Sequence, residues 1–128
     1  MNGIFGIGTD IVDVSRIKIY LSKNKNFKKK LFSLNEIKIV ETKFNKIGSY
    51  AKRFAAKEAF SKALGTGISN GISFNEIEVV NNNKGKPYIV FLGKTKLIVN
   101  RTLKKKYKVF LSISDEKKYA SAFVVISY

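Results

Sequence analysis

Acidic side chains are scarce in this sequence, and residues able to perform catalysis are few. The 128 residues include 25 Lys and Arg but only nine Asp and Glu, which gives a formal net charge of +16, and they include no His and no Cys. These absences exclude a thiolate nucleophile, a Ser-His triad and metal sites built on His or Cys. Any metal must therefore be a hard cation held by carboxylates and other oxygens, which indicates Mg²⁺, with Mn²⁺ as the alternative.

Two of the acids lie in segments with clear structural patterns. Asp10 stands near the end of a strand predicted over 4–12, and Glu58 lies within an alanine-rich helix predicted over 48–64. Lys62 follows Glu58 by four residues and therefore shares its face of the helix. Two interpretations stay open. One is a surface ion pair, and the other is a carboxylate that holds a divalent cation beside an ammonium directed at phosphate oxygens.

The glycines before Asp10 also allow two interpretations. Gly6 and Gly8 form a Gly-x-Gly pattern, which occurs in nucleotide-binding loops, but the pattern completes neither the dinucleotide-binding nor the P-loop motif. The segment is equally consistent with a strand that simply tolerates glycine.

Periodicity and capping signals predict the remaining elements. Ser33 and Glu36 form a capping box that opens a helix reaching about residue 44, whereas the lysine-rich segment 23–30 is expected to be a loop or a helix end. A turn is expected over 81–87. The other helices are predicted over 14–21 and 94–106, and the other strands over 74–80, 88–92, 109–113 and 119–126. This order predicts one α+β domain over 1–128, without a repeat or a linker.

The excess of positive charge indicates an anionic partner, such as nucleic acid, an acidic protein, a phosphorylated metabolite or an anionic membrane. Two basic stretches, 14–35 and 79–114, contain no acid. The first residues lack the pattern of a secretory signal, and the longest apolar runs have only the length of a strand. We therefore expect a cytoplasmic protein without a membrane span.

Two segments, taken together, resemble a known enzyme family. GIGTDIVDVSRI at 6–17 and RFAAKEAFSKALGTGI at 53–68 are similar to the two signature blocks of bacterial holo-[acyl-carrier-protein] synthases, which are small 4′-phosphopantetheinyl transferases. Gly85-Lys86-Pro87 and the ending SIS…YASAFVVI from residue 112 match in the same order. The resemblance implies an α+β fold and a homotrimer with active sites between subunits. It also implies transfer of 4′-phosphopantetheine from coenzyme A to a serine of acyl carrier protein, with release of 3′,5′-ADP, in fatty acid biosynthesis.

The resemblance assigns the metal and catalytic roles to three residues. It implies that Asp10 and Glu58 hold Mg²⁺, which also binds the pyrophosphate of coenzyme A, and that Lys62 reaches the same phosphates. Phosphoryl transfer depends mainly on positioning and charge stabilisation, so a chain without Cys or His can perform it.

Binding roles follow from the same resemblance. Arg53 is expected near the phosphates of the cofactor, and the turn Gly85-Lys86-Pro87 near its adenine end. Arg16 is expected to contact the acidic recognition helix of acyl carrier protein.

One segment departs from the family pattern. Where relatives usually carry His-x-Ser-x-Ser-His, this chain has Phe110 and Asp115 at the two histidine places. The serine proton must then pass to a metal-bound water or to Glu58 acting through water. The departure leaves open a catalytically impaired relative. The charge and the basic helix over 94–106 leave open a small RNA- or ribosome-binding module, which the absence of a known RNA-binding motif disfavours.

Overall fold

The computed structural model describes residues 2–67, 71–104 and 106–128. In chain order the elements are β1 (Ile4–Asp13), α1 (Val14–Lys23), α2 (Lys25–Leu31), α3 (Leu34–Val40), α4 (Lys46–Leu64), the 3₁₀ turn η1 (Phe74–Glu76), β2 (Ile77–Asn81), β3 (Pro87–Phe91), α5 (Gly93–Leu103), β4 (Lys108–Asp115) and β5 (Tyr119–Ser127). No helix in these described ranges is long and apolar enough to cross a membrane.

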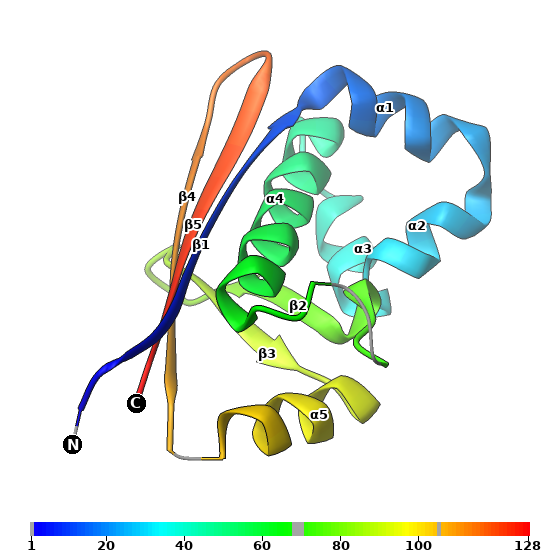
Figure 1. Ribbon diagram of the computed structural model, residues 1–128. Helices are drawn as coiled ribbons and strands as arrows, with labels where there is room; N and C mark the ends of the chain where they lie inside the picture. Colours follow the sequence, from blue (N-terminus) through cyan, green and yellow to red (C-terminus); the bar gives the residue numbers. More distant parts are fainter. Residues whose placement is uncertain (1, 68–70, 105) are drawn as a thin grey trace.

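An antiparallel sheet and one long helix form the centre of the fold. The sheet has the strand order β1-β5-β4, and α4 lies along one of its faces, while β2 and β3 form a separate hairpin (Figure 1). Helices α1, α2 and α3 lie on the far side of α4 from the sheet (Figure 1). The α+β class predicted from the sequence is confirmed.

The two faces of the sheet differ in what covers them. On β5, side chains alternate between the faces, and Ala122, Val124 and Ile126 are buried on the side of α4. On the opposite face Ile7 and Phe110 both pair in register with Val125, and both remain at least half exposed. The sheet therefore has a covered inner face and an apolar outer face.

Gly6 and Gly8 allow α4 to lie unusually close to β1. A Cβ atom at Gly6 would overlap the carbonyl oxygen of Ala63, and one at Gly8 would overlap that of Ala59. Both glycines lie in strand β1, as the strand interpretation expects, but the strand requires glycine at these positions rather than simply tolerating it. The close approach also brings the end of β1 beside the middle of α4.

A buried ion pair attaches three other segments to α4. Lys57 is completely buried, and its Nζ donates to Glu36 Oε1 at 2.6 Å and to the carbonyl oxygens of Leu31 and Phe74, both at 2.8 Å. Glu36 Oε2 in turn accepts from the backbone N–H of Val79 at 3.0 Å. Lys57, the residue before Glu58, is therefore the point where three segments meet: the end of α2, the start of α3 and the η1–β2 segment.

The lysine-rich segment 23–30 is mostly helical, contrary to the expectation of a loop or helix end. Asn24 is extended and its side chain accepts from the backbone N–H of Asn26 at 2.9 Å, which caps the N-terminus of α2. Lysine is a good helix former, so a run of lysines continues a helix once a cap begins it.

Other boundaries differ by a few residues. The capping box of α3 is present, but the helix ends at Val40, because the chain turns at 41–45. Helix α5 ends at Leu103 rather than 106, since Lys104 adopts a left-handed conformation with φ of 58°. Lys105 lies outside the described residues. Residues 74–76, predicted as strand, form η1 ahead of β2.

Candidate active site

The structure brings Asp10, Glu58 and Lys62 together where β1 meets α4. Lys62 Nζ donates to Asp10 Oδ1 at 3.1 Å and to the carbonyl oxygen of Thr9 at 3.0 Å. The ammonium group of Lys62 thus links α4 to β1, and its ion pair is with Asp10 rather than with Glu58 on its own helix. The Asp10 side chain is 15% exposed and that of Lys62 is 54% exposed, so the ammonium remains accessible from solvent.

Glu58 lies half-buried near Asp10, and the two carboxylates repel each other. Burial raises the pKa of Glu58, the negative charge of Asp10 raises it further, and the positive charge of Lys62 lowers it. Among the described residues no group of three or more His, Cys, Asp or Glu side chains is placed to hold a metal. A cation here would have these two carboxylates and would complete its coordination with other oxygens, as Mg²⁺ commonly does.

Arg16 lies beside Asp10 and Glu58. A cavity of about 270 Å³ is lined by Asp10, Glu58 and Arg16, with Tyr20 and Phe54 among its apolar walls. Helix α1 begins there because Asp13 accepts from Ser15 through both its backbone N–H and its hydroxyl, and these hydrogen bonds lower the pKa of Asp13. The predicted partner-binding arginine is therefore next to the predicted metal ligands.

Arg53 is separated from this cluster. The residue is 5% exposed and lines a second cavity of about 670 Å³, together with Gly85 at the hairpin turn. Its Nη1 donates to Ser49 Oγ at 2.7 Å, whereas its Nε has no hydrogen-bond partner among the described residues. Burial lowers the pKa of this guanidinium. Lys43, Lys52 and Phe44 line the same cavity, although no motif in the sequence indicates them.

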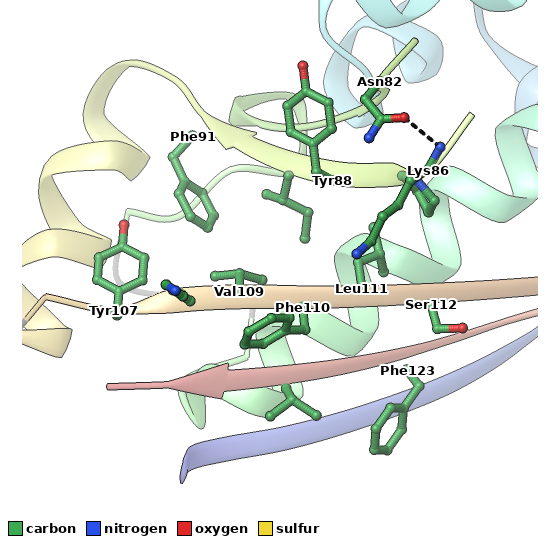
Figure 2. Close-up of a pocket in the computed structure, with 14 residues that line it drawn as sticks. Asn82, Lys86, Tyr88, Phe91, Tyr107, Val109, Phe110, Leu111, Ser112 and Phe123 are labelled. Atoms are coloured by element: carbon green, nitrogen blue, oxygen red, sulfur yellow. Dashed lines mark hydrogen bonds between the residues drawn. The ribbon is translucent and has the colours of Figure 1, made fainter. Parts of the chain in front are cut away.

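Lys86 and Pro87 line a third cavity, of about 820 Å³, between the hairpin and β4. Figure 2 shows the Lys86 side chain extending from the hairpin toward β4, with its backbone N–H donating to Asn82 Oδ1 at 2.9 Å. Phe110 lines this cavity, but Asp115 lies toward the other end of β4. The residues predicted to bind coenzyme A are thus distributed over separate cavities of one chain.

Comparison with known proteins identifies the family. The model of the 4′-phosphopantetheinyl transferase superfamily matches residues 6–124, and the chain belongs to this superfamily. Within it, the chain is similar to holo-[acyl-carrier-protein] synthases. That of Pelagibacter ubique (strain HTCC1062) is 50% identical over 124 residues, which are 96% of each chain.

Solved structures agree with this assignment. The crystal structure of the synthase from Neisseria meningitidis is 36% identical, has a TM-score of 0.86, and is matched over 97% of this chain and 98% of that one. The synthase from Bacillus anthracis in complex with CoA (3′,5′-ADP) is also 36% identical, with a TM-score of 0.79 and coverage of 97% and 96%. The family resemblance inferred from the two sequence blocks is confirmed.

Proposed function

We propose that this protein transfers the 4′-phosphopantetheine group of coenzyme A to a serine of apo acyl carrier protein. The serine oxygen attacks the β-phosphorus, a new P–O bond forms, and the bond to the departing 3′,5′-ADP breaks. The single observation that carries the proposal is the meeting of Asp10, Glu58 and Lys62 at the junction of β1 and α4, in a member of this superfamily. Supply of holo carrier protein for fatty acid biosynthesis, in the cytoplasm, is part of the same proposal.

Asp10 and Glu58 are the proposed Mg²⁺ ligands, with Mn²⁺ as an alternative. The donor set fits a hard cation, because both groups are carboxylates and because a shared cation would offset the burial and the repulsion by Asp10 that raise the pKa of Glu58. When bound, the cation neutralises charge on the pyrophosphate of coenzyme A.

Lys62 supplies a second positive charge for the reacting phosphates. Its ammonium is held over the site by Asp10 and by the carbonyl of Thr9, and its exposure leaves room for a phosphate oxygen beside it. A charge fixed in place before the reaction stabilises the developing negative charge without reorganisation. Glu58 lies in the same cluster and is the protein group proposed to accept the serine proton through a water molecule.

Arg53 is proposed to bind a phosphate of coenzyme A, and the turn Gly85-Lys86-Pro87 to lie near its adenine end. A buried guanidinium that lines a cavity favours an anionic ligand there, since such a ligand would neutralise its charge. Gly85 lines the cavity that Arg53 occupies, which supports placing the two ends of the nucleotide there.

A homotrimer is proposed as the functional assembly, with active sites between subunits. The apolar outer face of the sheet supports association, because Ile7, Ile11, Phe110 and Phe123 are all exposed there. Sites shared between subunits would also account for cofactor-binding residues that lie in different cavities of one chain.

Arg16 is proposed to dock the acidic carrier protein beside the reacting groups. It lines the cavity that holds Asp10 and Glu58, and it belongs to a stretch without acids whose other cations are Lys18, Lys23, Lys25, Lys28, Lys29 and Lys30. An RNA- or ribosome-binding role is not favoured, because the similarity to synthases extends over nearly the whole chain.

The decisive experiment is incubation of the protein with apo acyl carrier protein, coenzyme A and Mg²⁺, followed by mass spectrometry of the carrier. We expect a mass increase of one phosphopantetheine and release of 3′,5′-ADP. Asp10→Ala and Glu58→Ala should each lower metal-dependent turnover at least about tenfold, whereas Glu116→Ala, at an exposed acid, should not. An unchanged carrier mass would overturn the proposal and favour an impaired relative.

A further inference from the structure

Helices α1 and α2 form an arm that leaves the centre of the molecule and returns to it. The arm begins where β1 ends beside the candidate active site, extends away from α4 along α1, and comes back toward α4 along α2 (Figure 1). Arg16 and the lysines of the arm are the charges proposed to dock the carrier protein. The orientation of the arm relative to α4 therefore decides where a docked carrier places its serine.

A buried ammonium group holds the returning end of this arm. Lys57 Nζ on α4 donates to the carbonyl oxygen of Leu31, the last residue of α2, at 2.8 Å. The last carbonyl groups of a helix have no partners within it, so the donor satisfies one of them, and its positive charge is favourable at this end of the helix. The ring of Phe32, directly after α2, has its centroid 5.0 Å from the same Nζ.

Lys57 is itself fixed in place. Its Nζ also donates to Glu36 Oε1 at 2.6 Å and to the carbonyl oxygen of Phe74 at 2.8 Å, and both side chains of the ion pair are completely buried. Breaking such a pair leaves an uncompensated charge in the interior, which is costly. Glu58, the proposed metal ligand, follows Lys57 in α4, so the attachment of the arm and the reacting site share one helix.

Two further contacts of α2 are exposed to solvent. Lys28 Nζ lies 3.4 Å from Glu41 Oε2, and Asn75 Nδ2 donates to the carbonyl oxygen of Lys29 at 3.1 Å. Water competes for exposed contacts of this kind, and exposed ion pairs contribute little to stability. The buried contact with Lys57 is therefore the one that determines the position of the end of α2.

We propose that Lys57 is a positioning residue for the transfer reaction. By holding the end of α2 against α4, it sets the place of the docked carrier relative to Asp10 and Glu58. This inference rests on the proposed function, which supplies the carrier protein. Lys57 is completely buried and touches no reacting group, so it acts only through the arm. A displacement of about 1 Å can lower a rate about 100-fold, so a small tilt of the arm is enough.

The first test measures the position of the arm without turnover. The chain has no Cys, so Asn26→Cys on α2 and Lys46→Cys at the start of α4 provide the only two sites for thiol-reactive spin labels. The double variant Glu36→Gln with Lys57→Met removes the contact and leaves no unpaired charge. We expect the distribution of distances between the labels to shift or broaden in it.

The matched control is Lys38→Met, which removes an exposed lysine of α3. The distribution of label distances in this control should equal that of the labelled protein without further substitution. The same distribution in the Glu36→Gln and Lys57→Met double variant would overturn the proposal.

The second test separates positioning from a loss of folded protein. The kcat for apo acyl carrier protein is divided by the number of sites that bind 3′,5′-ADP, so that unfolded molecules do not count. In the double variant we expect kcat per site to fall at least about tenfold. The Kd for 3′,5′-ADP, and for a carrier protein with alanine in place of its reacting serine, should stay within about twofold of wild type, because the docking charges and the cofactor cavity are unchanged.

The remaining outcomes are distinguishable. If the wild-type protein modifies the carrier and kcat per site is unchanged in the double variant, Lys57 is merely structural, and the positioning proposal is wrong while the proposed function stands. A loss of carrier affinity with unchanged kcat per site would also overturn it, since that result places the effect in docking. If the wild-type protein does not modify the carrier, the proposed function fails, and the role of Lys57 in the reaction fails with it.

Discussion

The ionised form of the Glu58 side chain is destabilised by its surroundings in the folded protein. Burial and the negative charge of Asp10 raise its pKa, and the nearby cation Lys62 pairs with Asp10 instead. An acid whose pKa is raised by folding binds its proton more tightly in the folded state than in the unfolded one. Stability is therefore greatest at a pH below the unfolded pKa, where the group is protonated in both states, and falls as the pH rises through the folded pKa.

We expect Glu58→Gln to stabilise the metal-free protein at pH 7 while lowering its activity. The amide removes the buried charge, so the melting temperature in a chelator should rise by about 1–3 °C. The gain should vanish at about pH 4, where much of Glu58 is protonated in the wild type. Thermal unfolding at the two pH values tests this, with Glu116→Gln as control. A lower melting temperature at pH 7 would contradict it.

Lys57, unlike Glu58, is a buried charged group whose ammonium has three hydrogen-bond acceptors, one of them an opposite charge. Burial lowers its pKa to about 8 despite the neighbouring Glu36. Replacing it with Met would leave the Glu36 carboxylate buried and two carbonyl oxygens without their donor. We expect Lys57→Met to lower the free energy of unfolding by about 3–5 kcal/mol, measured in urea.

Two variants check this interpretation. Lys38→Met, at an exposed lysine of α3, should change stability by less than about 0.5 kcal/mol. Adding Glu36→Gln to Lys57→Met should recover part of the loss by removing the uncompensated charge. A Lys57→Met variant as stable as wild type would show that the ion pair contributes nothing.

At the scale of elements, the contact between β1 and α4 depends on glycine. The carbonyl oxygen of Ala59 occupies the space that a Cβ atom at Gly8 would need, and as a backbone atom it cannot move aside as the end of a flexible side chain could. We expect Gly8→Ala to cost at least about 2 kcal/mol in stability and to reduce metal-dependent turnover, because separation of the two elements would move Glu58 away from Asp10. Gly3→Ala is the control, since its Cβ would meet only the ring of Tyr128, at ordinary contact distance. Equal stability of the two variants would refute this role.

Helix α1 carries the proposed docking charge. We expect Arg16→Ala to raise KM for acyl carrier protein and to flatten its dependence on salt, because exposed charges at an interface mainly raise the association rate and are screened over about 10 Å at 0.1 M salt. KM for coenzyme A should stay nearly unchanged. Lys38→Ala, at an exposed lysine on α3, provides the control. An equal loss for both substrates would instead place Arg16 in the cofactor site or in the fold.

At the scale of the whole molecule, the uncovered face of the sheet predicts self-association. One chain has a mass of 14.4 kDa, and sedimentation equilibrium at micromolar concentration should give three times that value. Phe123→Asp should dissociate the assembly and abolish turnover by placing a charge on the apolar face, whereas Leu34→Asp on α3 should do neither. A fully active species with the mass of one chain would overturn the trimer.

Features that depend on residues close in the sequence were predictable. The capping box of Ser33 and Glu36 forms as expected, and α4 ends at Gly65 in the left-handed conformation that glycine favours. The α2 helix was missed because a run of lysines signals solvent exposure more clearly than it signals a helix. The signature blocks also identified the family, because they preserve residue types at fixed spacing.

Tertiary structure alone decided which distant groups meet. Lys62 pairs with Asp10, 52 residues away, although Glu58 lies on its own helix face, and Lys57 is buried against Glu36 although most lysines here are exposed. Arg53 and Gly85 line one cavity, whereas Lys86 and Pro87 line the cavity between the hairpin and β4. Such pairings depend on how closely α4 approaches β1 and on which face of each element the core covers. Sequence spacing specifies the faces of one element, and only the packing of several elements specifies which faces meet.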